Sequence, residues 1–195
     1  MSRRLWLASL NAHKAEELGR MLVGHNVEVL SLASRPDIGE PPETGTTFEE
    51  NALQKARFVF EATGEPALAD DSGLEVDALQ GAPGVHSKRY TAEATAASNN
   101  RALLMALDGV SDRRARFVCA LALVSKLGEE VVRGTVEGEI GHAPRGEGGF
   151  GYDPLFLPAD APGRTMAELS PQEKDNISHR GRAVAHLPNL LADLL

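Results

Sequence analysis

The chain has 195 residues, 42% of them hydrophobic and 25% charged, which suffices for one globular domain with a buried core and excludes a disordered or fibrous protein. Its formal net charge of −8 disfavours non-specific binding to a nucleic-acid backbone, because such binding requires a basic surface. The single cysteine excludes a disulfide framework, as in proteins of a reducing compartment. Because Cys119 lies in an apolar run, we expect it to be buried.

The N-terminal apolar stretch is too short for a signal sequence or a membrane span, since polar residues begin at Asn11. We therefore expect a cytoplasmic protein that has no membrane partner.

The first half of the chain alternates between strand and helix patterns. Residues 5–9 form a short apolar run that predicts a buried strand, and a helix should begin directly after Asn11. One face of that helix carries Ala15, Leu18 and Leu22. A proline-rich loop at residues 35–45 precedes a longer helix, and Thr47 and Glu50 have the spacing of a capping box at its start. The apolar stripe of this second helix is Phe48, Ala52, Ala56 and Val59, and residues 64–66 end it.

The second half of the chain contains further strands and helices. The predicted strands are residues 67–69, which should stop at the acidic pair, then 116–125 and 130–137, which a turn around Gly128 joins as an antiparallel hairpin. The predicted helices are residues 98–107, a segment with a capping box at Ser170 and Glu173, and a last helix from about 181 that Pro188 interrupts. Strands that alternate with helices, plus one hairpin, predict a single α/β domain over residues 1–195, with a mixed central sheet and flanking helices.

The first candidate site is the segment from Ser9 to Lys14, where a strand ends and a helix begins. Backbone N–H groups and the positive end of the helix dipole bind anions at such a position. A lysine in the first turn opposes the dipole, and a bound triphosphate would remove that conflict. The alternative is an ordinary Asn11 cap beside a solvated Lys14.

The second candidate site is Asp70, Asp71 and Ser72, at the end of a predicted strand, where α/β sheets bind ligands. Successive side chains of an extended chain point in opposite directions, so one aspartate is able to hold Mg²⁺ while the other braces the loop. Glu43 is able to complete such a magnesium site with Asp71, whereas Glu50 already has a role in the capping box. The alternative is an Asx-turn with two solvated acids.

Two further segments carry groups suited to a purine base. The glycine-rich loop at residues 146–151 leads into Phe150, which offers a flat face for stacking, although a tight connection packed on the core is the alternative. Lys174, His179 and Arg180 form a group of donors without an acid among them. Histidine and arginine donors suit the O6 and N7 edge of a purine, and an exposed basic helix end is the alternative.

Six segments in this order resemble the inosine triphosphate pyrophosphatases, also called non-canonical purine NTP pyrophosphatases. They are SLNAHK (9–14), ETGTTFEENA (43–52), ADDSGL (69–74), GAPGV (81–85), FGYDP (150–154) and ISHRG (177–181). The resemblance spans nearly the whole chain. It departs from the family pattern at Ser9-Leu10-Asn11, where Thr-Gly-Asn is usual, so that leucine replaces a glycine able to adopt a positive φ.

The resemblance implies two lobes around a nucleotide cleft, a homodimer, and Mg²⁺ as the cofactor. It implies hydrolysis of ITP, dITP and XTP to the monophosphate and pyrophosphate, which keeps these nucleotides out of DNA and RNA. By the same resemblance Asp71 is the proton acceptor and a metal ligand, and Glu43 is a second metal ligand. The residues implied to bind the triphosphate or sugar are Ser9, Asn11, Lys14, Lys55 and Ser72. The residues implied to bind the base are Phe150, Gly151, Tyr152, Asp153, Lys174, His179 and Arg180.

Two other functions compete with this one. A nucleotide-sensing module would keep the cleft without hydrolysis, although intact Asp70, Asp71 and Glu43 argue against it. A phosphatase acting on monophosphates would release orthophosphate, but the sequence contains no phosphatase nucleophile motif.

Overall fold

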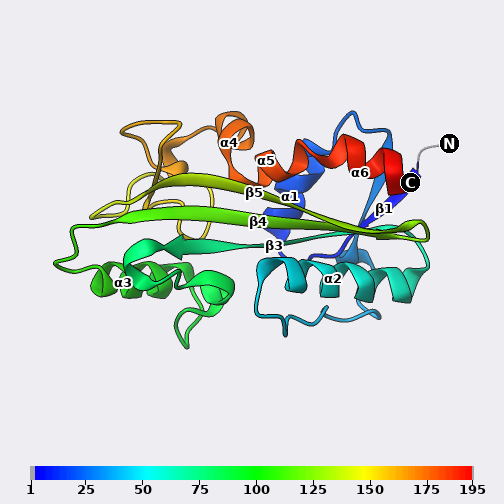
Figure 1. The fold of residues 1–195 in the computed structure, drawn as a ribbon, viewed down its shortest axis with the longest axis horizontal. Coiled ribbons are helices and arrows are strands. Elements are labelled where there is room, and N and C mark those ends of the chain that lie inside the picture. The colour runs from blue at the N-terminus through cyan, green and yellow to red at the C-terminus, as the bar shows by residue number, and fades with distance from the viewer. Residues whose placement is uncertain (1–2, 195) are drawn as a thin grey trace. The chain divides into compact units, whose positions relative to one another are not determined.

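The computed structural model describes residues 3–194 and contains one six-stranded sheet of order β2-β1-β3-β4-β5-β6 (Figure 1). Its strands are β1 Arg3–Leu7, β2 Val27–Ser31, β3 Ala67–Val76, β4 Arg114–Ser125, β5 Gly128–Ile140 and β6 Phe156–Pro158. β1 pairs in parallel with β2 and β3, whereas β6 pairs antiparallel with β5. The expected mixed α/β fold is therefore confirmed.

Six α-helices accompany the sheet in the part of the chain that the structure describes. They are α1 Ala12–Met21, α2 Phe48–Thr63, α3 Ala96–Ala106, α4 Pro171–Ile177, α5 His179–Val184 and α6 Leu187–Leu194. Within residues 3–194, no helix combines the length and the hydropathy that a membrane crossing requires.

The chain divides into two compact units, each with its own hydrophobic core. The first unit contains the chain up to Asp71, Cys119–Gly134 and the part from Arg180 onward; the second contains Ser72–Val118 and Thr135–His179. The core of the first unit includes Leu18 of α1 and Leu22, the C-cap residue of that helix, together with Cys119, which is fully buried as expected. The second core includes aromatic residues of β4, β6 and the loop between β5 and β6.

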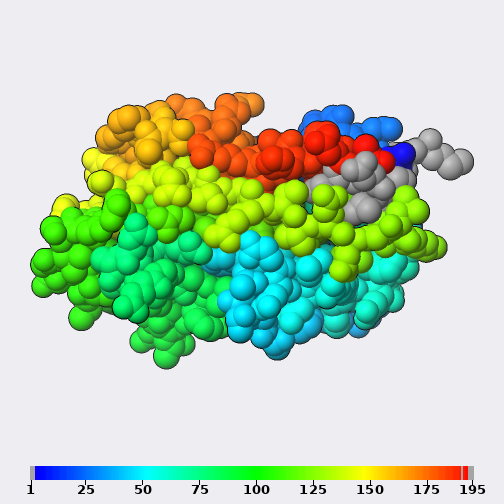
Figure 2. Space-filling model, viewed as in Figure 1, coloured from blue at the N-terminus to red at the C-terminus, as the bar shows by residue number. Residues whose placement is uncertain are grey.

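Surface ion pairs join α2 to β5 in the first unit. Arg57 Nε lies 2.7 Å from a carboxylate oxygen of Glu129, and Arg133 Nη1 lies 2.8 Å from Glu49 Oε1. Figure 2 shows α2 in cyan beside the yellow-green β4–β5 hairpin. These side chains are about half exposed, so we expect each pair to add little stability.

Local hydrogen bonds explain where the helices begin. The predicted capping boxes are confirmed at the start of α2, where Thr47 Oγ1 accepts from Glu50 N at 3.1 Å, and at the start of α4. A third capping box, between Thr95 and Ser98, starts α3 at Ala96 instead of residue 98.

One expectation for the strands was wrong, two strands were missed, and the last helix is interrupted just before Pro188. β3 does not stop at the acidic pair but continues to Val76, because the charges of both aspartates are compensated by side chains elsewhere in the chain. β2 and the three-residue β6 were not anticipated. The C-terminal helix begins at His179 and breaks at residues 185–186, so that Pro188 lies in the first turn of α6, where proline is tolerated.

A buried arginine binds three backbone carbonyls in two segments of the second unit. The Arg113 guanidinium donates to Ile140 O at 2.6 Å, Leu107 O at 3.0 Å and Gly141 O at 2.8 Å. We expect Arg113→Met to lower the free energy of unfolding by about 2–3 kcal/mol, since it leaves buried carbonyls without donors. Urea denaturation tests this, with Arg101→Met on the exposed face of α3 as the control. Equal stability of the two variants would contradict the role given to Arg113.

Candidate active site

The turn between β1 and α1 is organised by its own side chains. Ser9 Oγ accepts from Asn11 N at 3.2 Å, and Asn11 Oδ1 caps α1 by accepting from the backbone N–H groups of His13 and Lys14. Leu10 is 49% exposed and does not adopt a positive φ. The leucine in place of the family glycine therefore introduces no backbone strain.

Lys14 has a carboxylate partner in the structure. Its Nζ lies 3.2 Å from Asp70 Oδ1, and its side chain is 15% exposed. Asp70 thus supplies the negative charge that a cation in the first turn of a helix requires. The alternative of a solvated Lys14 is wrong, and the expected role of Lys14 in triphosphate binding remains a prediction.

Arg180 is fully buried and binds two acids of the first unit. Its Nη2 donates to Asp70 Oδ2 at 2.8 Å, and its Nη1 donates to Glu17 Oε2. Burial alone would lower the pKa of Arg180, but the charges of Asp70 and Glu17 outweigh it and hold that pKa above its ordinary value. The alternative of an exposed basic helix end is therefore wrong for Arg180, whereas its predicted contact with a base stays a prediction.

Three of the predicted site residues meet at one ammonium group. Lys55 Nζ lies 2.8 Å from Asp71 Oδ1 and 2.9 Å from Glu43 Oε1. The side chains of Lys55 and Asp71 are 8% and 10% exposed, whereas Glu43 is 30% exposed. Asn51 Nδ2 completes the environment of Asp71 by donating to Oδ2 at 3.2 Å. Two carboxylates and one cation thus converge in the first unit.

Burial changes the proton affinity of this group. Burial has the largest effect on the pKa of Asp71 and raises it above the ordinary value, although the charges of Lys55 and Lys14 act in the opposite direction. Burial would lower the pKa of Lys55, but the charges of Asp71, Asp70 and Glu43 outweigh it and raise that pKa. A raised pKa makes Asp71 a stronger base than an exposed aspartate.

The second unit brings together the predicted residues of the loop after β5 with α4. Lys174 Nζ lies 2.6 Å from Asp153 Oδ2 and 4.8 Å from the centre of the Phe150 ring. Asp153 Oδ2 also accepts from Phe150 N at 2.8 Å. Phe150, Asp153 and Lys174 therefore form one contact group.

Neighbouring side chains anchor this loop. The Tyr152 hydroxyl donates to Ser87 O at 2.9 Å, and Asn100 Nδ2 donates to Gly151 O at 3.1 Å. Both bonds lie within the second unit, so they limit the positions that the loop is able to adopt.

His179 and Ser72 have surroundings of their own. His179 is 6% exposed, and its ring stacks on Phe117 with centroids 4.9 Å apart and planes at 18°. Ser72 is half-buried in β3, directly after Asp71.

Asn51, Glu17 and Phe117 were missed by the sequence reasoning. Asn51 lies one helical turn before Lys55 on the buried face of α2, and this i, i+4 spacing was a signal that pointed to it. Glu17, the acidic neighbour of the buried Leu18, gave a weaker signal. Nothing in the local sequence links Phe117 to His179.

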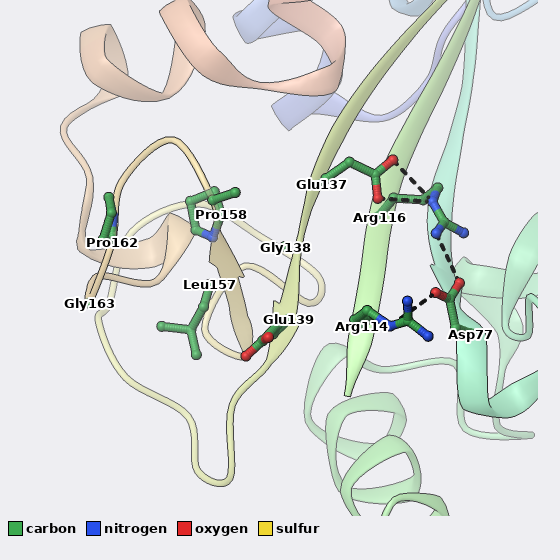
Figure 3. Close-up of a pocket in the computed structure, with 11 residues that line it drawn as sticks. Asp77, Arg114, Arg116, Glu137, Gly138, Glu139, Leu157, Pro158, Pro162 and Gly163 are labelled. Carbon is green, nitrogen blue, oxygen red and sulfur yellow. Dashed lines mark hydrogen bonds and ion pairs between the residues drawn. The ribbon is translucent and has the colours of Figure 1, made fainter. Parts of the chain in front are cut away.

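The groove in Figure 3 belongs to the second unit and holds none of the predicted residues. Its volume is about 510 Å³, and Leu157 and Pro158 form part of its apolar wall. Arg116 lies between Asp77, at 2.9 Å, and Glu137, at 3.1 Å (Figure 3). Because none of the residues singled out from the sequence lines this groove, it is a weaker candidate than the group around Asp71.

The two carboxylates beside Lys55 are suited to a hard cation. Within residues 3–194, no group of three His, Cys, Asp or Glu side chains is placed to hold a metal ion. Asp71 and Glu43 nevertheless approach the same cation, Lys55 Nζ. Two carboxylates match the way Mg²⁺ is usually held, with substrate phosphates and water as its other ligands.

Known proteins resemble this chain along nearly its full length. The Ham1 family model matches residues 5–190. A dITP/XTP pyrophosphatase of Mycolicibacterium paratuberculosis is 54% identical over 97% of this chain and 96% of its own, and one of an Exiguobacterium species is 52% identical over 94% of each chain. The solved structure of a HAM1 protein from Coxiella burnetii has a TM-score of 0.87 and 43% identity, and the match covers 97% of this chain and 98% of that one.

Proposed function

The chain belongs to the Ham1 family, and on that premise we propose that it hydrolyses non-canonical purine nucleoside triphosphates to the monophosphate and pyrophosphate. Its substrates are ITP, dITP and XTP, and their removal keeps them out of DNA and RNA. The observation that carries this proposal is the meeting of Asp71 and Glu43 at Lys55 Nζ. Binding of a metal–triphosphate complex requires carboxylates that hold the metal and a cation that binds the phosphates, and this group of residues contains both.

Mg²⁺ fits the donors that the first unit offers. Asp71 and Glu43 would hold it, and it would neutralise negative charge on the phosphoryl oxygens and on the leaving pyrophosphate. The positive end of α1, with Ser9, Asn11 and Lys14, would bind the triphosphate together with Lys55 and Ser72.

Asp71 acts on the attacking water in this mechanism. The water oxygen forms a bond to the α-phosphorus, Asp71 accepts one of its protons, and the bond from the α-phosphorus to the bridging oxygen breaks to release pyrophosphate. In the metal-free protein burial raises the pKa of Asp71 above its ordinary value, so its carboxylate is a stronger base than an exposed aspartate. Lys55 keeps the carboxylate in place through its 2.8 Å contact.

The contact group of the second unit supplies base recognition. Phe150 offers its ring for stacking, and Lys174 acts as a donor to the purine O6 and N7. The family resemblance assigns His179 and Arg180 to the same edge, although Arg180 is fully buried and already donates to Asp70 and Glu17. Gly151, Tyr152 and Asp153 shape this side of the site. Adenine is disfavoured because its amino group presents a donor where the site requires an acceptor.

Gly149 keeps the base-binding loop in its conformation. Its φ is +68°, and a Cβ there would lie 2.1 Å from Asp153 Oδ2. We expect Gly149→Ala to raise KM for ITP by about tenfold, since it displaces Asp153 from Lys174. Steady-state kinetics test this, with Gly109→Ala as the control, because Gly109 has nearly the same positive φ but open space around its Cβ position and no proposed role in the site. An equal rise in both variants would show that backbone strain, and not the clash, is responsible.

The first experiment compares ITP, dITP, XTP, GTP and ATP as substrates, with and without Mg²⁺. Pyrophosphate and orthophosphate are assayed separately, and the nucleotide product is identified. The proposal requires Mg²⁺-dependent pyrophosphate release with IMP, dIMP or XMP, and little turnover of ATP or GTP. Orthophosphate alone would favour a phosphatase, and tight ITP binding without turnover would favour a sensing module.

The family relation also supports a homodimer in the cytoplasm as part of this proposal. Light scattering of the purified protein tests the dimer, and a monomeric mass under assay conditions would contradict it.

A further inference from the structure

Asn51 connects two parts of the first unit that contribute to the site. Its Nδ2 donates to Asp71 Oδ2 at 3.2 Å, and its Oδ1 accepts from Gly45 N at 2.8 Å. The residue is 2% exposed, so bulk water does not compete for these bonds. One side chain therefore links Asp71 to the loop that carries Glu43.

The loop at residues 43–47 is held to α2 by several helix side chains. Gln54 Oε1 accepts from Thr44 N at 3.0 Å, and Glu50 Oε2 accepts from Thr46 N at 2.6 Å. Asn51 resembles Gln54 and Glu50 in binding the loop but differs from them in its bond to Asp71. This difference separates an effect on the loop from an effect on Asp71.

The partners of Asn51 determine the orientation of its amide. A backbone N–H is a donor, so Gly45 faces the amide oxygen and the NH₂ group faces Asp71. A Cβ on residue 45 would lie 2.6 Å from Glu50 Cβ and 2.9 Å from Asn51 Oδ1, so glycine permits this approach. Asp71 then has one donor at each oxygen, because Lys55 Nζ lies 2.8 Å from Oδ1.

We propose that Asn51 is a positioning residue that fixes the rotation of the Asp71 carboxylate relative to Glu43. The inference rests on the proposed function, in which Asp71 binds the metal and the attacking water. If the Asn51 amide is removed, the hydrogen bond from Lys55 Nζ to Oδ1 remains, and the Asp71 carboxylate is able to rotate about that single bond. The loss is expected in kcat more than in KM, because other residues bind the triphosphate and the base.

Two substitutions of Asn51 separate its two bonds. Asn51→Asp preserves the size and the acceptor for Gly45 N but replaces the donor to Asp71 by a repelling oxygen. Asn51→Leu removes both bonds without adding charge. Gln54→Leu is the matched control, because it removes a bond to the same loop from the same helix.

The experiment measures kcat and KM for ITP at saturating Mg²⁺, at a temperature where circular dichroism shows every variant folded. We expect both Asn51 variants to lower kcat by about tenfold with little change in KM, and Gln54→Leu to stay near wild type. Wild-type kcat in Asn51→Asp, or equal losses in Asn51→Leu and Gln54→Leu, would overturn the inference. If Asn51→Leu does not fold, Asn51→Asp alone carries the test.

A second measurement does not depend on turnover. Titration of Mg²⁺ into the nucleotide-free protein, followed by calorimetry, should show several-fold weaker binding in Asn51→Leu than in Gln54→Leu or wild type. Equal affinities would contradict the inference. A wild-type protein that releases no pyrophosphate from ITP would instead refute the proposed function, so the two failures are distinguishable.

Discussion

Replacing Asp71 by asparagine should lower kcat for ITP by about three orders of magnitude, within the range that a positioned proton acceptor contributes. Asparagine has nearly the same volume but neither accepts a proton at neutral pH nor carries the charge that a metal ligand requires. The fold should persist, because Lys55 keeps Glu43 as a partner at 2.9 Å. Pyrophosphate release under saturating Mg²⁺ measures the effect.

A matched change elsewhere controls for the loss of one carboxylate. Asp112 is exposed and pairs with Arg114, so Asp112→Asn should turn over ITP at the wild-type rate. Residual activity of Asp71→Asn within tenfold of that control would remove Asp71 from the catalytic role.

Replacing Arg180 by methionine should lower the free energy of unfolding by about 3–5 kcal/mol, the cost of removing one partner from a buried ion pair. The change leaves the buried carboxylates of Asp70 and Glu17 without the guanidinium that neutralises both. Lys14 compensates the charge of Asp70 in part, at 3.2 Å. Urea denaturation followed by circular dichroism measures the change.

Arg57→Met is the control for Arg180, because Arg57 pairs with Glu129 on the surface and is 48% exposed. Exposed pairs contribute between about 0 and 1 kcal/mol, so this variant should unfold near the wild-type denaturant midpoint. If Arg180→Met is no less stable than Arg57→Met, the buried ion pairs do not support the first unit.

Local patterns predicted the elements whose determinants lie close together in sequence. The start of α2 depends on Thr47 and Glu50, three positions apart, and its buried stripe follows from helical spacing. The family resemblance is confirmed for the same reason, since the motifs are short contiguous segments.

The course of β3 was not predictable from its own residues. Two adjacent acids predict the end of a strand unless the cationic side chains that pair with them are known. Those side chains are Lys14, Lys55 and Arg180. The predicted start of α3 was two residues late, because Ser98, read as the first helical residue, is the third residue of the helix and pairs with the N-cap Thr95 in a capping box.

Membership of the candidate site was partly predictable. Glu43, Lys55 and Asp71 were singled out in advance, and the structure places them in contact. Asn51 and Glu17 were not: helical spacing places Asn51 on the same face as Lys55, but it does not identify partners that lie 20 and 163 positions away.

Because β3 continues through Asp70 and Asp71, these two identical side chains have different ion-pair partners. Neighbouring residues of a strand face opposite sides, so Asp70 belongs to the buried ion pairs of Arg180, whereas Asp71 belongs to the group around Lys55. Insertion or deletion of one residue before Asp70 would exchange the two sides and remove both arrangements at once. The spacing of this strand is therefore expected to tolerate no length variation, even where the surrounding loops do.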